Sequence, residues 1–116
     1  MNQISYEERA RIYTDAQATL GANVLLIEAL EKLSDVQKEI CKTIKRGGCS
    51  YHLAEKVADT TIMLEQVRLM FGINAEVCKI MDHKVIELKQ RTEFAQARQR
   101  PDLAAILDLF GKGLEG

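Results

Sequence analysis

The chain has 116 residues, of which 47% are apolar and 28% are charged, and its net charge is −1. This length and composition predict one soluble globular domain and exclude a disordered chain. Because the net charge is nearly zero, no overall field attracts nucleic acid or an anionic membrane. The start resembles no signal peptide, and no apolar run approaches the ~18 residues of a membrane span.

Helical periodicity runs along most of the chain, and one proline, Pro101, lies near its end. Four main helices are expected, at residues 6–20, 22 to about 46, about 52–71, and from Asn74 toward Pro101. Glycines should end the first three, with Gly47 or Gly48 acting as a left-handed cap of the second helix. Residues 1–100 should form the helical domain, and residues 101–116 a short terminal helix and tail.

Three of these helices carry an apolar stripe that we expect to face inward. The stripes are Leu26, Leu30, Leu33, Val36, Ile40 and Ile44; Leu53, Val57, Thr61, Leu64 and Val67; and Val77, Met81, Val85 and Leu88. With short connections, this pattern predicts an all-α bundle of antiparallel helices. The first helix and the terminal segment are too weakly amphipathic to complete a large core, so we expect a dimer or tetramer.

The three cysteines have neither paired spacing nor an even number. This usage predicts reduced thiols in a cytoplasm, with Cys41 and Cys78 as small core residues. His52 and His83 lie at no zinc-ligand spacing from the cysteines, so a zinc site is not supported.

Two similar phrases occur on the second and third predicted helices. Glu31-Lys32-Leu33-Ser34-Asp35 matches Glu55-Lys56-Val57-Ala58-Asp59 in the order acid, lysine, spacer, spacer, acid. Glu28, Lys32, Asp35 and Glu39 share one helix face, as do His52, Lys56, Asp59 and Met63. If the helices are antiparallel neighbours, Lys32, Asp35, Lys56 and Asp59 should form one cluster.

In these phrases, and in "HLAEKVADTTIMLEQVRLMFGI" and "VCKIMDHKVIELKQR", the chain resembles the MazG-like all-α nucleoside triphosphate pyrophosphohydrolases. The similarity runs from about Asn23 to Arg91 and is nearest to the short single-domain forms of phages and bacteria. It implies Mg²⁺-dependent hydrolysis of a nucleoside triphosphate to a monophosphate and pyrophosphate. The family motifs are Glu-Glu-x-x-Glu and Glu-Glu-x-x-Asp, whose second and last acids bind the metal.

The resemblance places Lys32, Asp35, Lys56 and Asp59 at the metal-ligand positions. Asp35 and Asp59 remain anionic, whereas Lys32 and Lys56 replace glutamates. An ammonium group has three donors and no acceptor, so it cannot bind Mg²⁺. Two lysines also neutralise two aspartates, with a Coulomb energy of about 4 kcal/mol per pair at 4 Å before desolvation. Metal-dependent activity should therefore be lost or severely weakened.

Two other interpretations stay open. Lys32 and Lys56 could be ordinary surface lysines, with Glu28 and Lys32 forming a helix pair. A displaced metal site could also use Glu28, Glu31 or Glu55 with Asp35 and Asp59. Glu31 and Glu55, however, lie about 100° around their helices from the lysines.

The resemblance also implies that Lys84 lies near substrate phosphates, and Lys89 and Arg91 are further candidates for substrate binding. Each could equally belong to an exposed basic surface. Two other functions compete with an impaired hydrolase: a protein that binds a nucleotide without cleaving it, and a helical oligomerisation module with no ligand.

Overall fold

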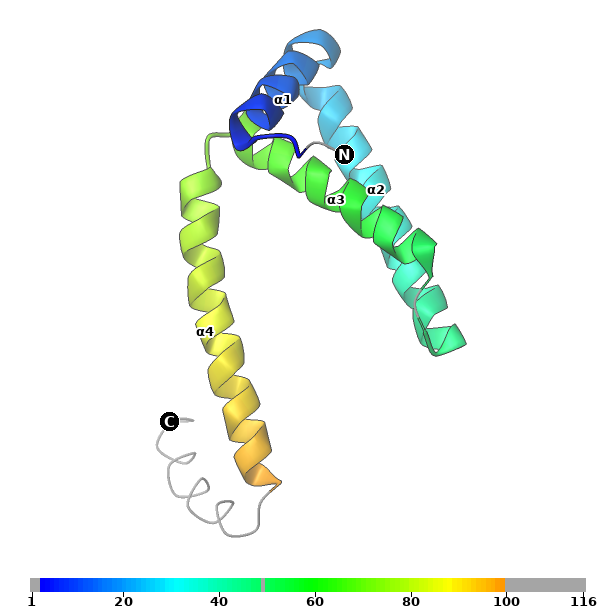
Figure 1. The fold of residues 1–116 in the computed structure, drawn as a ribbon, viewed down its shortest axis with the longest axis vertical. Coiled ribbons are helices and arrows are strands. Elements are labelled where there is room, and N and C mark those ends of the chain that lie inside the picture. The colour runs from blue at the N-terminus through cyan, green and yellow to red at the C-terminus, as the bar shows by residue number, and fades with distance from the viewer. Residues whose placement is uncertain (1–2, 49, 100–116) are drawn as a thin grey trace. The chain divides into compact units, whose positions relative to one another are not determined.

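The computed structural model describes residues 3–48 and 50–99, which contain four helices and no strand. The helices are α1 (Tyr6–Leu20), α2 (Ala22–Arg46), α3 (Tyr51–Met70) and α4 (Asn74–Arg98) (Figure 1). The all-α prediction is confirmed, and the predicted bounds of α1, α2 and α3 are met to within about one residue, while α4 begins at Asn74 as predicted and ends at Arg98, short of Pro101. The terminal helix expected after Pro101 lies outside the described residues. None of the described helices is long and apolar enough to cross a membrane.

Local sequence explains where the first helices begin and end. Ser5 accepts a hydrogen bond from the backbone N–H of Glu8 (3.1 Å) and so caps α1. Gly47 ends α2 with φ of 77°, and its N–H donates to the carbonyl of Thr43 (3.0 Å). This left-handed conformation suits glycine, which has no Cβ, so the predicted cap at Gly47 is confirmed.

The chain divides into two compact units, one ending at Ala75 and the other beginning at Glu76. In the first unit α2 and α3 are antiparallel neighbours, and α1 contacts both of them. The link from α1 to α3 includes the hydroxyl of Tyr13, which donates to Glu65 (2.9 Å), while Arg9 lies 3.4 Å from the same carboxylate. Partial burial, the hydrogen bond and the negative charge of Glu65 raise the pKa of Tyr13 to about 12.

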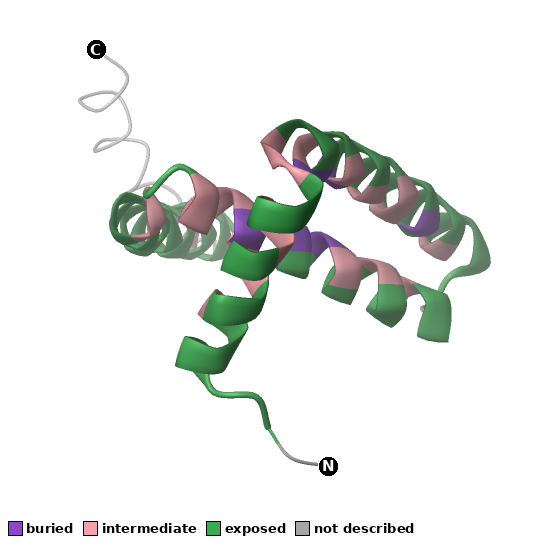
Figure 2. Cartoon of the chain, turned by 90° about the horizontal axis from the view of Figure 1, so that it is seen from above, coloured by how far each residue is buried: buried purple, intermediate pink, exposed green. Residues whose placement is uncertain are grey.

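The contact between α2 and α3 holds a small and unusually polar core. Among the described residues the buried apolar side chains are Leu25, Ala29 and Met63, and the buried polar residues are Glu39, Thr60 and Gln66. Figure 2 shows these few buried positions against largely exposed helix surfaces. Burying so little apolar surface contributes little to stability, because the hydrophobic contribution scales with the buried area.

The prediction that the apolar stripes face inward is wrong for most of their residues. Their exposed members are Leu30, Leu33, Ile40 and Ile44 on α2, Val57, Thr61 and Leu64 on α3, and Met81, Val85 and Leu88 on α4. The buried residues of α2 are instead Leu25, Ala29 and Glu39, on the neighbouring flank, from which Lys32 reaches Asp59 of α3. Periodicity identifies an apolar flank, but it does not show that this flank packs within the same chain.

The prediction that Cys41 and Cys78 are core residues is also wrong. Both thiols are free and exposed. The usual burial of reduced cysteine does not apply to them, because Cys41 follows the exposed Ile40 on α2 and Cys78 lies on α4, which has no buried residue.

A lysine–aspartate cluster between α2 and α3

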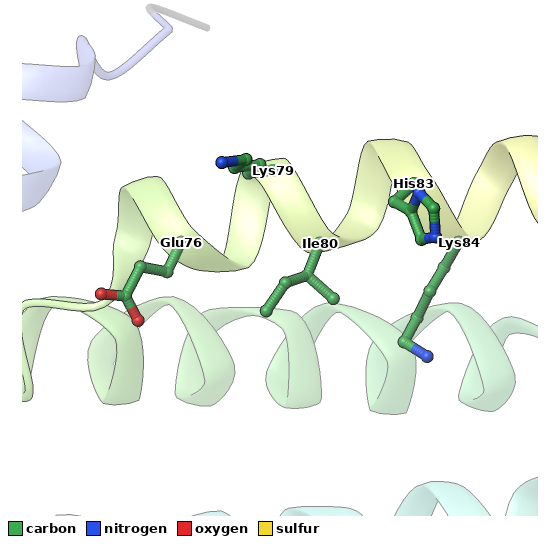
Figure 3. Close-up of a pocket in the computed structure, with 5 residues that line it drawn as sticks. All are labelled: Glu76, Lys79, Ile80, His83 and Lys84. Atoms are coloured by element: carbon green, nitrogen blue, oxygen red, sulfur yellow. The ribbon is translucent and has the colours of Figure 1, made fainter.

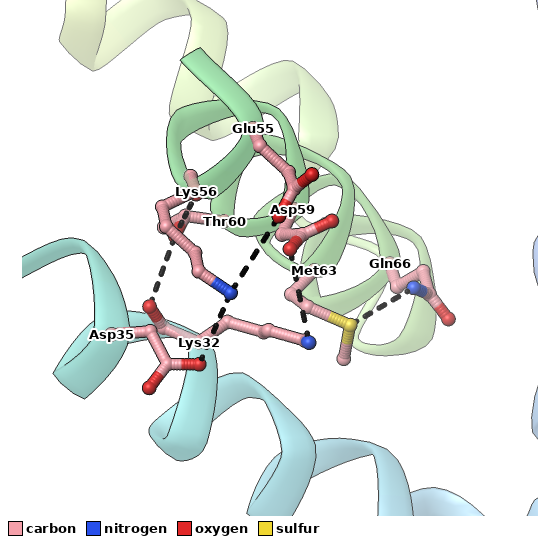
Figure 4. Close-up of polar contacts among 8 residues, drawn as sticks. All are labelled: Lys32, Asp35, Glu55, Lys56, Asp59, Thr60, Met63 and Gln66. Carbon is pink, nitrogen blue, oxygen red and sulfur yellow. Dashed lines mark hydrogen bonds and ion pairs between the residues drawn. The ribbon is translucent and has the colours of Figure 1, made fainter. Parts of the chain in front are cut away.

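Each lysine of the two matching phrases reaches the aspartate of the other helix. Lys32 Nζ lies 3.8 Å from Asp59 Oδ2, and Lys56 Nζ lies 3.9 Å from Asp35 Oδ2 (Figure 4). In each phrase the aspartate follows its lysine by three residues, about one helical turn, and the two helices are antiparallel. One helix's lysine therefore meets the other's aspartate, and the predicted meeting of the two polar stripes is confirmed.

The hydroxyl of Thr60 links α3 to α2 near these ion pairs. Its hydroxyl lies 2.8 Å from the carbonyl oxygen of Lys56 and 3.2 Å from that of Lys32. The hydroxyl has one proton to donate, so it is shared between its own helix and α2. Sequence reasoning missed Thr60, although its position four residues after Lys56 places it on the same helix face as that lysine.

The two ion pairs contribute less to stability than their Coulomb energy before desolvation would suggest. The four charged side chains are between 28% and 39% exposed, so water screens them substantially. Partly exposed pairs of this kind are worth about 0.2–1 kcal/mol each, rather than the ~4 kcal/mol expected before desolvation. Both N···O distances also exceed the length of a good hydrogen bond, so the ammonium groups retain donors for water.

The remaining acidic candidates do not complete a metal site. Glu55 lies 3.9 Å from Lys56 Nζ, Glu31 is exposed, and Glu28 is partly buried. Across residues 3–48 and 50–99, no three His, Cys, Asp or Glu side chains come together in a way that could hold a metal ion.

The Mg²⁺ that the resemblance implies does not fit the residues present. Asp35 and Asp59 are the two carboxylates at the four positions that the resemblance assigns to metal ligands, and each has an ammonium group at about the distance of a direct ion pair. A hard divalent cation needs several oxygen ligands and would be repelled by both lysines. With Glu55 included, three carboxylates face two ammonium groups, which leaves a single uncompensated negative charge.

The candidate phosphate-binding residues Lys84, Lys89 and Arg91 lie on α4, in the second unit, and are exposed. Lys89 Nζ lies 4.0 Å from Glu93 one turn later. Lys84 borders a surface hollow with Glu76, Lys79, Ile80 and His83, and Figure 3 shows Glu76, Ile80 and Lys84 along one side of α4. Lys79 and Lys84 beside Ile80 on a single helix do not by themselves identify a substrate.

Comparison of the chain with protein-family models, with curated proteins and with solved structures finds no match in any of the three. The lysine–aspartate cluster is therefore interpreted from its own geometry and from the resemblance of its motifs.

Proposed function

We propose that the chain is a MazG-like nucleoside triphosphate pyrophosphohydrolase domain by descent, in which metal-dependent hydrolysis is lost or severely weakened. The observation that supports this most strongly is the reciprocal pairing of Lys32 with Asp59 and of Lys56 with Asp35. The family motifs place metal-binding glutamates at both lysine positions. Lysine at equivalent positions of both helices gives two positive and two negative charges at the four positions, whereas a single lysine would leave an excess of negative charge.

The chemistry follows from the charges. In an intact site Mg²⁺ would neutralise substrate phosphates and activate a water molecule for attack at phosphorus. In this chain the two ammonium groups supply positive charge beside Asp35 and Asp59, so these carboxylates are already balanced without a metal. An ammonium group has no lone pair with which to accept a proton from water, so the lysines balance the carboxylates but do not activate a nucleophile.

Pyrophosphate release tests this proposal. A panel of nucleoside triphosphates would be incubated with the chain and Mg²⁺ or Mn²⁺, beside an intact MazG-like hydrolase as the positive control. We expect a rate at least ~100-fold below that of the control, since removal of catalytic groups usually costs this much or more. A comparable rate would contradict the loss of metal-dependent hydrolysis.

A second candidate function is nucleotide binding without cleavage. It is favoured by the partial exposure of Lys32 and Lys56, whose side chains are 36% and 28% exposed and retain hydrogen-bond donors that could contact phosphates. The nearby carboxylates oppose it, because they would repel the same phosphates. Calorimetry with nucleotides in EDTA tests this second function. Measurable binding without metal supports nucleotide binding without cleavage, and the absence of heat with every nucleotide removes it.

We also propose that the chain assembles as a dimer or tetramer, whether or not it binds a ligand. The support is the large number of exposed aliphatic side chains beside a very small core. A pure oligomerisation module would form the same assembly after charge changes at Lys32 and Lys56. Sedimentation of those variants beside the unaltered chain provides that test.

A further inference from the structure

Helix α1 contacts α2 and α3 but buries little apolar surface against them. None of its residues is buried, and its partly exposed residues, Ala10, Tyr13, Ala16 and Gln17, recur at the spacing of one helix flank. Two of these four side chains are single methyl groups. Because the hydrophobic contribution scales with the buried area, it holds α1 in place only weakly.

A single residue, Gly21, joins α1 to α2. Its φ of 89° and ψ of 151° lie in a region that glycine alone adopts readily. The N–H of Gly21 donates to the carbonyl of Gln17 (2.9 Å) in α1, and its carbonyl accepts from the N–H of Leu25 (3.3 Å) in α2. The φ and ψ bonds of Gly21 lie between these two hydrogen bonds. A rotation about either bond therefore changes the angle between the helices and breaks neither hydrogen bond, so Gly21 can act as a hinge.

One carboxylate of α3 links two turns of α1 to that helix. The hydroxyl of Tyr13 donates to Glu65 (2.9 Å), and Arg9 Nη1 lies 3.4 Å from both oxygens of the same carboxylate. Arg9 and Tyr13 are four residues apart, so they reach Glu65 from neighbouring turns of one flank. The side chain of Glu65 is 27% exposed, so water screens these contacts only in part.

We propose that α1 is a hinged arm, which pivots at Gly21 and is held closed by the carboxylate of Glu65. Opening of the arm breaks the links from Arg9 and Tyr13 to Glu65. The contact between α2 and α3 keeps its own links, which are the hydrogen bond from Thr60 to the carbonyl of Lys32 and the two lysine–aspartate pairs. Opening also exposes the part of α3 that α1 contacts. This inference does not rest on the nucleotide chemistry proposed above.

Hydrogen exchange makes the opening measurable, because a detached α1 should lose its helix. The arm has 15 residues, and isolated helices of about this length are marginal in water. Its central amides should therefore exchange together whenever the arm opens, with one shared protection factor. Fraying from Tyr6 would instead give protection that rises gradually toward Leu20.

Native-state hydrogen exchange of the full-length chain, followed by NMR, tests the arm. In the unaltered chain we expect residues 10–17 to share a protection factor at least ~10-fold below that of residues 57–63 on α3. Tyr13→Phe keeps the ring but removes the donated proton, and should lower the protection of residues 10–17 by about 3–10-fold. Glu65→Ala removes both links and should lower it by about 10–100-fold. Neither variant should change residues 57–63 by more than about 2-fold.

Glu31→Gln, which removes the charge of an exposed carboxylate on α2, is the matched control and should leave both segments unchanged. Residues 10–17 as strongly protected as residues 57–63 would show that α1 does not open alone, and would overturn the proposal. A gradual rise in protection along α1 would also overturn it. So would an equal loss of protection in both segments of the variants, because Glu65 would then stabilise the whole unit. If Glu65→Ala does not fold, Tyr13→Phe decides the question.

Discussion

The double substitution Lys32→Glu with Lys56→Glu, called the double reversal below, probes the cluster most sharply, because it introduces the acids that the family motif has at both positions. It removes the ion pairs from Lys32 to Asp59 and from Lys56 to Asp35, which are 3.8 and 3.9 Å long. It also places four carboxylates in the cluster, with Glu55 beside them. Without a metal, these groups repel one another.

The magnitude follows from the geometry. Two partly exposed pairs account for about 0.4–2 kcal/mol together, and each new contact between like charges near 4 Å costs about 1 kcal/mol or more. We therefore expect the metal-free variant to lose about 2–4 kcal/mol of its unfolding free energy. For a domain of this size, such a loss lowers Tm by roughly 10 °C or more.

Mg²⁺ should reverse most of this loss, because it binds the folded variant and not the unfolded chain. A concentration 100 times the dissociation constant contributes about 2.7 kcal/mol to stability. The assay is thermal unfolding followed by circular dichroism, in EDTA and in rising MgCl₂ at constant ionic strength. Lys38→Glu with Lys45→Glu, which changes the charge equally on exposed lysines of α2, is the matched control.

A Tm of the double reversal that does not respond to Mg²⁺ would refute this reasoning. It would show that the phrases on α2 and α3 do not occupy metal-ligand positions. A Mg²⁺ response of equal size in the Lys38 and Lys45 control would also refute it, because the stabilisation would then be non-specific screening.

Three further predictions concern the fold around the cluster. Thr60→Val keeps the shape of the side chain but removes the hydroxyl that links α3 to the carbonyl of Lys32. It should lower the unfolding free energy by about 0.5–1.5 kcal/mol, and Thr60→Ser should recover most of this loss; urea denaturation measures both. The pKa of Tyr13 is about 12 in the folded chain and near 10 in the unfolded chain. Between pH 10 and pH 12 the folded chain therefore holds a proton that the unfolded chain has lost. The free energy of unfolding should fall over this range as pH rises, by less than about 1.4 kcal/mol per pH unit. Tyr13→Phe should remove this slope from urea titrations at each pH, and an unchanged slope would show that another group causes it. Gly47→Ala should lower the free energy of unfolding by about 1 kcal/mol, because φ of 77° strains any residue with a Cβ. Equal urea midpoints for the variant and the unaltered chain would contradict the left-handed cap.

The sequence predicts the helices well because their signals are local. Gly21 and Gly47 adopt positive φ at the ends of α1 and α2, where a residue without Cβ is favoured. The charged cluster was also predictable. The matching spacing in the two phrases determines which side chains share a face, and antiparallel neighbours then bring them together.

The packing was less predictable because it depends on what each flank contacts. Thr61 was expected on the inner stripe of α3, yet it is exposed, and its neighbour Thr60 is 9% exposed. Leu33 and Val57 belong to apolar stripes, but within the first unit they are 41% and 47% exposed. Periodicity cannot distinguish a flank that packs within a chain from one that packs between chains.

Under the proposed function, the ammonium groups of Lys32 and Lys56 take the place of a divalent metal ion beside Asp35 and Asp59. The most direct measurement is an NMR titration of the unaltered, ¹⁵N-labelled chain with Mn²⁺, whose paramagnetism broadens signals near a bound ion. We expect no saturable broadening at Asp35 and Asp59 at concentrations that saturate the Lys32→Glu, Lys56→Glu variant. Saturable broadening centred on Asp35 and Asp59 in the unaltered chain would contradict it.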